Sequence, residues 1–162
     1  MNIYKIIIII TFTSCMFASN ISSFGYGYNT PLYTHFTYMF FHAGYIHLIF
    51  NSYVFYTLTN NILFKNNVVL FTLLYLIAVI TSFIAYSDYP TIGASTMIFA
   101  MAGINFPIVK NKKKYLTVFP LIILTGFIIP HVNGLAHAVS AILGIISGFI
   151  KYGFDKRKYI QK

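Results

Sequence analysis

The sequence contains no glutamate and no tryptophan, and it has two aspartates and a single cysteine, Cys15. A zinc protease of the H-E-x-x-H type needs its glutamate, and an aspartyl protease needs two carboxylates in one embedded site. Asp88 is expected in a loop and Asp155 in a basic tail, so both classes are excluded. Cys15 has no partner for an internal disulfide, and its simplest interpretation is a small apolar packing residue.

Charge is scarce as a whole. Only 8% of the residues are charged and 58% are hydrophobic, whereas an ordinary soluble domain has about 25% charged residues. The mean hydropathy is +0.75. Such a chain cannot cover an apolar core with polar surface, so we expect the lipid bilayer to be its solvent. Residues 1–162 are expected to form one membrane domain without internal repeats or linkers.

The apolar stretches predict an all-α, polytopic membrane protein with six spanning helices, because most approach the roughly 20 residues needed to cross hydrocarbon. The predicted spans are 3–19, 36–59, 67–86, 92–109, 115–130 and 134–151, with a core at 36–151 and a basic tail at 152–162. The first span can also be interpreted as a signal sequence, with Phe17-Ala18-Ser19 as its cleavage site. Its removal would leave five spans.

The basic residues fall on one side of this arrangement. With the N-terminus in the cytoplasm, all eleven Lys and Arg residues lie on the cytoplasmic side, including Lys5, Lys65, the 110–114 cluster and the tail. This pattern predicts that both termini are cytoplasmic. The net charge of +9 is therefore explained by juxtamembrane lysines, and a nucleic-acid partner is not expected.

Polar residues within apolar spans are costly and mark candidate sites. His47 and Asn51 lie one helical turn apart and share a face, so both can point at the same spot. His42 is expected at the mouth of that span. Polar contacts between helices explain the pattern equally well.

A second candidate is Ser95, which follows Gly93 and Ala94 at the start of an apolar helix. The free N–H groups and positive dipole end there can stabilise an oxyanion. A helix N-cap is the alternative interpretation of this serine. The elbow motif G-x-S-x-G of soluble hydrolases does not fit, because Met97 occupies the position of its second glycine.

A third candidate is His137, on a span whose small residues recur every four positions (Ala136, Ser140, Gly144, Gly148). This face allows close approach of another helix, and a seam that joined His137 to Ser95 would create a nucleophile and its base. A metal site is disfavoured because His42 and His47 lack the usual helical ligand spacing.

The three segments together resemble the rhomboid family of intramembrane serine proteases. The H-x4-H-x3-N pattern is matched by His42, His47 and Asn51, the G-x-S motif by Gly93 to Ser95, and the A-H motif with trailing small residues by Ala136 and His137. The resemblance covers residues 36–151 and implies a six-helix rhomboid-like bundle, with a bacterial plasma (inner) membrane as its expected location.

The resemblance also implies a mechanism. Ser95 and His137 would form a catalytic dyad, and the oxyanion would be held by the Ser95 N–H with His47 and Asn51, with His42 nearby. The loop 87–91 would dip toward the site. Substrates would be transmembrane segments of other proteins that unwind near the outer boundary, and no cofactor or metal would be needed.

The sequence departs from the family pattern at several positions. Thr96 replaces a glycine and is expected to crowd the oxyanion pocket. Phe99 replaces a tyrosine and should still stack on the histidine, Ser140 replaces a packing glycine, and the Trp-Arg pair of the first loop is missing. Two alternatives to a protease stay open: a non-catalytic rhomboid-like protein that binds membrane clients, with Thr96 as its best support, and a small transporter or channel component.

Overall fold

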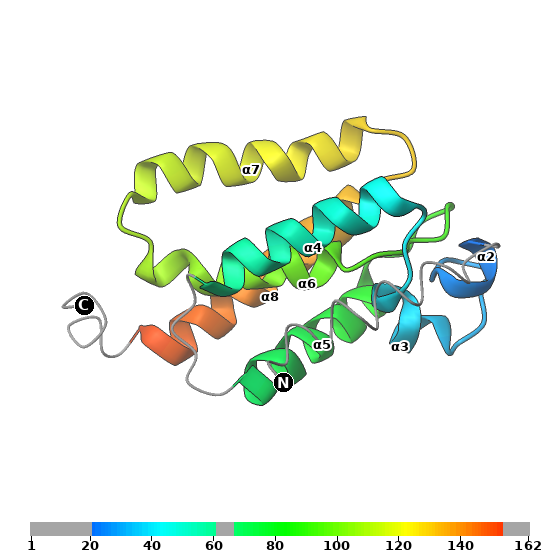
Figure 1. Cartoon of the computed structure of the whole chain (residues 1–162), viewed down its shortest axis with the longest axis horizontal. Coiled ribbons are helices and arrows are strands. Elements are labelled where there is room, and N and C mark those ends of the chain that lie inside the picture. The colour runs from blue at the N-terminus through cyan, green and yellow to red at the C-terminus, as the bar shows by residue number, and fades with distance from the viewer. Residues whose placement is uncertain (1–20, 61–66, 154–162) are drawn as a thin grey trace.

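The structure is a computed structural model that describes residues 21–60 and 67–153. Within these ranges the regular structure is helical apart from one antiparallel bridge between Tyr26 and Thr91. The elements in chain order (Figure 1) are α2 (Ile21–Phe24), α3 (Thr34–Thr37), the 3-10 helix η1 (Tyr38–Phe40), α4 (Tyr45–Asn60), α5 (Asn67–Ile84), α6 (Ser95–Asn105), the 3-10 helix η2 (Phe106–Ile108), α7 (Lys112–Ile128) and α8 (Gly134–Tyr152).

The long helices α4 to α8 coincide with the predicted spans after the first, while the predicted span 3–19 and the tail 154–162 lie outside the described residues. One boundary prediction is wrong. The span predicted at 36–59 begins as a helix only at Tyr45, because residues 34–40 form α3 and η1 and residues 41–44 are not helical. Tyr38 and Met39 of that apolar run are buried inside the protein, a use of apolar residues that hydropathy does not distinguish from a lipid-facing helix.

Helix α6 is the centre of the bundle and is buried almost all round, from Thr96 to Asn105. It packs most closely on α8. A Cβ atom added to Gly103 would collide with the backbone of α8, and one added to Gly144 or Gly148 would collide with the backbone of α6. These glycines let the two backbones approach, as small residues do between helices in lipid. The close seam fixes the depth of α8 relative to α6.

The outer faces of the helices carry large apolar side chains. On α4 they include Ile46, Ile49 and Phe50, and on α7 Leu121 and Ile128, all at least half exposed. Such a surface suits lipid and not water. Among the described residues, α8 is the helix whose length and composition would allow it to cross a membrane; Val68–Ile84 and Ser95–Ile108 are apolar but shorter.

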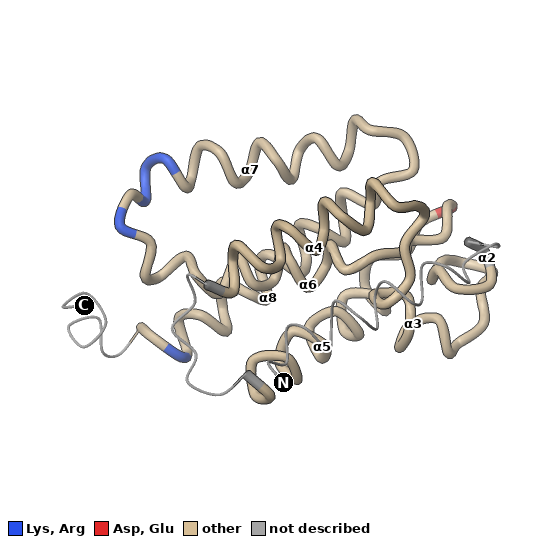
Figure 2. Tube along the Cα trace, in the orientation of Figure 1, with Lys and Arg blue, Asp and Glu red and all other residues tan. Residues whose placement is uncertain are grey.

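Charged residues are separated along the bundle (Figure 2). The described lysines (Lys110, Lys112, Lys113, Lys114, Lys151) lie at one end and Asp88 lies at the other. This separation is what the positive-inside pattern predicts. The predicted cytoplasmic placement of the two termini falls outside the described residues.

The segments before α4 and α6 meet at the end opposite the lysines. Tyr26 and Thr91 exchange backbone hydrogen bonds of 3.0 and 2.8 Å. The ring of Tyr26 is fully buried and packs edge-on against that of Tyr38, with centroids 4.5 Å apart. This contact fixes the segment that leads into Ser95.

Candidate active site

The turn before α6 presents Ser95. Gly93 has a φ of +110°, a backbone conformation that residues with a side chain rarely adopt, and its N–H donates to the Tyr38 carbonyl at 3.0 Å. Ala94 is the N-cap and Ser95 the first residue of α6. The N–H groups of this first turn have no partner within the helix and form its positive end, so Ser95 sits where developing negative charge is stabilised.

His137 on α8 lies next to this serine. Its Nε2 is 3.1 Å from Ser95 Oγ, within hydrogen-bond distance, and both side chains are partly exposed. The residues are 42 positions apart in the sequence and meet because α6 and α8 pack closely. The structure thus brings together the two residues that the sequence singled out, while their catalytic roles stay a prediction.

The ring of His137 is held by apolar and small neighbours. Phe99, one turn after Ser95 on α6, stacks on it with centroids 4.1 Å apart and an interplanar angle of 20°, so the predicted stacking is confirmed. His137 Nδ1 is buried without a hydrogen-bond partner among the described residues. It faces Gly126 of α7, where an added Cβ would lie 3.0 Å away. For Nε2 to accept the Ser95 proton, Nδ1 must carry the proton of the neutral ring.

Asn133 anchors the start of α8, one turn before His137. Its Oδ1 accepts from Ala136 N–H at 2.9 Å as the helix N-cap. Its Nδ2 donates to the Ala85 carbonyl and to Thr91 Oγ1, both at 2.9 Å. The amide therefore ties the helix that carries His137 to the loop that leads to Ser95. Asn133 was not singled out from the sequence; an asparagine just before the first residue of a predicted span is the N-cap signal that could have identified it.

His47 and Asn51 on α4 approach the same turn from another side. A Cβ added to Gly93 would lie 2.6 Å from His47 Cε1 and 3.5 Å from Asn51 Nδ2. Asn51 is buried, and its Nδ2 has no hydrogen-bond partner among the described residues. A buried donor left unused is costly, and it lies beside the turn that carries Ser95. The expected shared face of His47 and Asn51 is confirmed.

His42 lies just before α4, at the mouth of the predicted span as expected. Its Nε2 accepts from Ala94 N–H at 3.4 Å, and its ring packs edge-on against His47 at 5.0 Å between centroids. A ring nitrogen that accepts a hydrogen bond carries no proton. In this arrangement Nε2 of His42 supports the turn before Ser95 and is not available to donate to an oxyanion.

Thr96 does not crowd the predicted oxyanion pocket beside Ser95, contrary to the expectation from the sequence. It is fully buried, and its Oγ1 lies 2.8 Å from the hydroxyl of Tyr38. The side chain of a residue next to Ser95 on a helix points about 100° away from it, which turns Thr96 toward η1 and α5.

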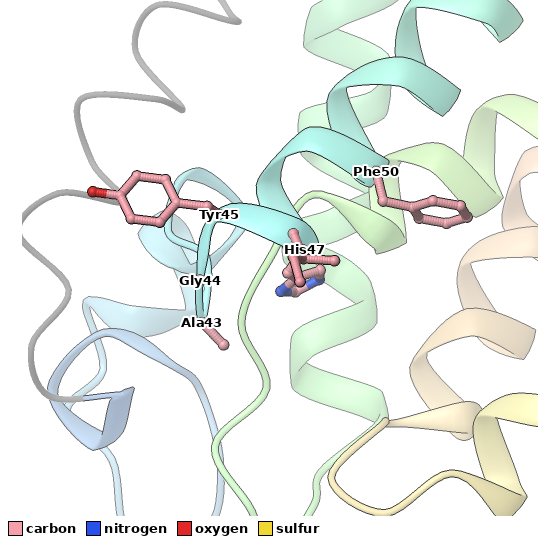
Figure 3. A pocket seen from close by; sticks show the side chains of 6 residues that line it. Ala43, Gly44, Tyr45, His47 and Phe50 are labelled. Atoms are coloured by element: carbon pink, nitrogen blue, oxygen red, sulfur yellow. The ribbon is translucent and has the colours of Figure 1, made fainter.

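An open cavity of about 630 Å³ lies beside the first turn of α4. Its lining is formed by Ala43, Gly44, Tyr45, Ile46, His47 and Phe50. Figure 3 shows Tyr45 and Phe50 pointing to opposite sides with His47 between them. The cavity is largely apolar and shares His47 with the site, but Ser95 and His137 do not line it.

The remaining polar candidates lie elsewhere. His35 stacks on Phe83 and bonds Ser82, and His131 packs against Tyr89. Asp88, the acidic residue among those that the structure describes, is exposed. Within the part of the chain that the structure describes, the site therefore offers a hydroxyl–imidazole pair without a carboxylate, together with amide and imidazole groups beside the serine.

A comparison with protein-family models matches residues 29–154 to the Rhomboid domain. A search of curated proteins gives no significant match to this chain. The matched range contains α3 to α8 and the candidate site residues, and it covers more than half of the chain. The chain belongs to the rhomboid family, and it is accordingly an integral membrane protein.

Proposed function

We propose that this protein is an intramembrane serine endopeptidase that cleaves transmembrane segments of other membrane proteins. The observation that carries the proposal is the 3.1 Å separation of Ser95 Oγ and His137 Nε2. A hydroxyl paired with an imidazole at a helix N-terminus is the arrangement of an activated nucleophile and its base. The family supports the same class of activity.

In the proposed reaction, His137 Nε2 accepts the proton of Ser95 as Oγ attacks the carbonyl carbon of a substrate peptide bond. The tetrahedral oxyanion is stabilised by the N–H of Ser95 and by side-chain donors of His47 and Asn51. His137 then gives the proton to the departing amine, which leaves an acyl-enzyme on Ser95. Water, activated by His137, hydrolyses that ester and regenerates the serine.

A fluorophosphonate probe tests the proposal, because it forms an adduct only with an activated serine. We expect labelling of the full chain in detergent micelles, with mass spectrometry placing the adduct on Ser95, and no labelling of Ser95→Ala. A matched control is Ser147→Ala, since that hydroxyl donates to a carbonyl of its own helix, that of Leu143, at 2.9 Å. An adduct that persists in Ser95→Ala would refute the assignment of the nucleophile.

We expect Asn51→Ala to slow cleavage about 10- to 1000-fold, the scale of losing one oxyanion donor. The reason is that Asn51 Nδ2, a donor without a partner in the described ranges, lies beside the turn of Ser95. The measurement uses a reporter whose single transmembrane segment carries glycine and proline near its outer end, because these residues ease unwinding.

The control for this variant is Ser52→Ala, the neighbouring change on the same helix. An unchanged cleavage rate in Asn51→Ala, with folding intact, would show that Asn51 has only a structural role.

The alternative of a non-catalytic client-binding protein had its best support in Thr96. That support weakens because the Thr96 side chain is fully buried and its hydroxyl faces that of Tyr38. The retained Ser95–His137 contact also has no use in a pure binding protein. Absence of any fluorophosphonate adduct on folded protein would favour this alternative.

A further inference from the structure

Tyr38, a residue that the sequence analysis did not single out, contacts the serine turn at two points. Its backbone carbonyl accepts from Gly93 N–H at 3.0 Å, two residues before Ser95. Its phenolic hydroxyl lies 2.8 Å from Thr96 Oγ1, one residue after Ser95. One side chain and its own backbone thus hold both flanks of the candidate nucleophile.

The phenol also reaches a third element. Tyr38 OH donates to the Ala78 carbonyl of α5 at 3.0 Å. Because a tyrosine hydroxyl has one proton, Thr96 must be the donor in its contact with Tyr38. The resulting chain runs from the Thr96 hydroxyl through the Tyr38 hydroxyl to the Ala78 carbonyl and links α6, η1 and α5.

These groups have no access to water that could replace the contacts. Tyr38, Thr96 and Ala78 are all fully buried, and Tyr26 packs against the Tyr38 ring. Removing one partner would leave a buried polar group unsatisfied. The start of α6 is therefore held in one place by a fully paired network rather than by apolar packing alone, which specifies geometry less sharply.

From these contacts we propose that Tyr38 is a positioning residue, which clamps the Gly93–Thr96 turn and so fixes the Ser95 hydroxyl against His137. The inference rests on the proposed function for its catalytic consequence. In this arrangement Thr96 is the partner that the clamp requires, and its presence after the serine strengthens the site instead of impairing it.

The test compares fluorophosphonate labelling rates of the full chain carrying Tyr38→Phe, Thr96→Val or both. Each single change should slow labelling about five- to tenfold, the scale of one lost hydrogen bond expressed in a rate. The double variant should be no slower than the slower single one, because both changes break the same network. Thr96→Ser retains the hydroxyl and should label at the rate of the unchanged chain.

Tyr75→Phe is the matched control, since its hydroxyl bonds the Phe36 carbonyl at 3.3 Å away from Ser95 and its loss should not affect labelling. A merely structural role would lower the thermal midpoint of Tyr38→Phe and Thr96→Val but leave the labelling rate of folded protein unchanged. That outcome would overturn the proposal, as would a double variant slower by the product of the single effects.

Hydrogen exchange separates failure of the clamp from failure of the proposed function. The amides of residues 92–97 should exchange faster in Tyr38→Phe than in the unchanged chain and in Tyr75→Phe. If the unchanged chain forms no adduct, the proposed function fails, and this exchange still decides whether the clamp exists. Equal exchange in all three proteins would refute the clamp.

Discussion

Replacing His137 with alanine is expected to lower both fluorophosphonate labelling and reporter cleavage about ten-thousandfold or more, the scale of losing the base of a serine hydrolase. The physical reason is that, among the described residues, His137 is the base whose ring nitrogen lies within hydrogen-bond distance of the Ser95 hydroxyl. Nε2 of His137 is 3.1 Å from Ser95 Oγ, and Asp88, the acidic residue within the described segments, is exposed in a loop. Without the imidazole, the Ser95 hydroxyl keeps its proton at neutral pH.

The His137→Ala variant removes a partly buried ring that stacks on Phe99, so folding must be followed in parallel by its thermal midpoint. His137→Gln offers a second variant that retains polar bulk but cannot act as a base. If either folded variant were labelled at the rate of the unchanged chain, His137 could not be the base that activates Ser95.

Replacing Gly93 with alanine is expected to lower the rate of fluorophosphonate labelling about a hundredfold or more. A φ of +110° is strained for any residue with a Cβ, at a cost of about 1–3 kcal/mol. The new Cβ would also lie 2.6 Å from His47 Cε1, so it must displace either the ring of His47 or the turn. Because a tenfold rate change corresponds to about 1.4 kcal/mol, the two effects together account for such a loss.

Gly44→Ala is the matched control for this change, since a Cβ there meets nothing within 4 Å and Gly44 directly precedes α4, the helix that carries His47. It should label normally. If Gly93→Ala also labelled normally, the turn could not have the conformation described, and the contact of His47 with the nucleophile segment would be wrong.

The sequence predicted the fold well where composition alone decides. The scarcity of charge, the apolar lengths and the placement of lysines predicted a helical membrane bundle, and the helices α4 to α8 lie where spans were expected. The predicted span was wrong at residues 36–44. The hydropathy of an apolar run is the same whether its residues face lipid or, like Tyr38 and Met39, are buried against neighbouring helices.

The site was predicted through residue types and spacing, with limits. Polar groups within apolar spans are energetically costly, which is why the sequence pointed to Ser95, His137, His47 and Asn51. Thr96 was misjudged, because adjacency in sequence to Ser95 suggested adjacency in the pocket, while the helix turns its side chain toward Tyr38. Tyr38 and Asn133 were missed as supporting residues, because their partners on other elements are set by packing.

The amino-acid sequence by itself determined that this chain is embedded in a membrane. It also determined where the long helices form and which few polar side chains they carry. Only the tertiary structure decided that the hydroxyl of Ser95 meets the ring of His137. Helix α6 is mostly apolar and buried on nearly all sides, so its pattern contains no preferred face to indicate its rotation. That rotation, and the depth of α8 beside it, follow from the interlocking of Gly103, Gly144 and Gly148 with the facing backbones.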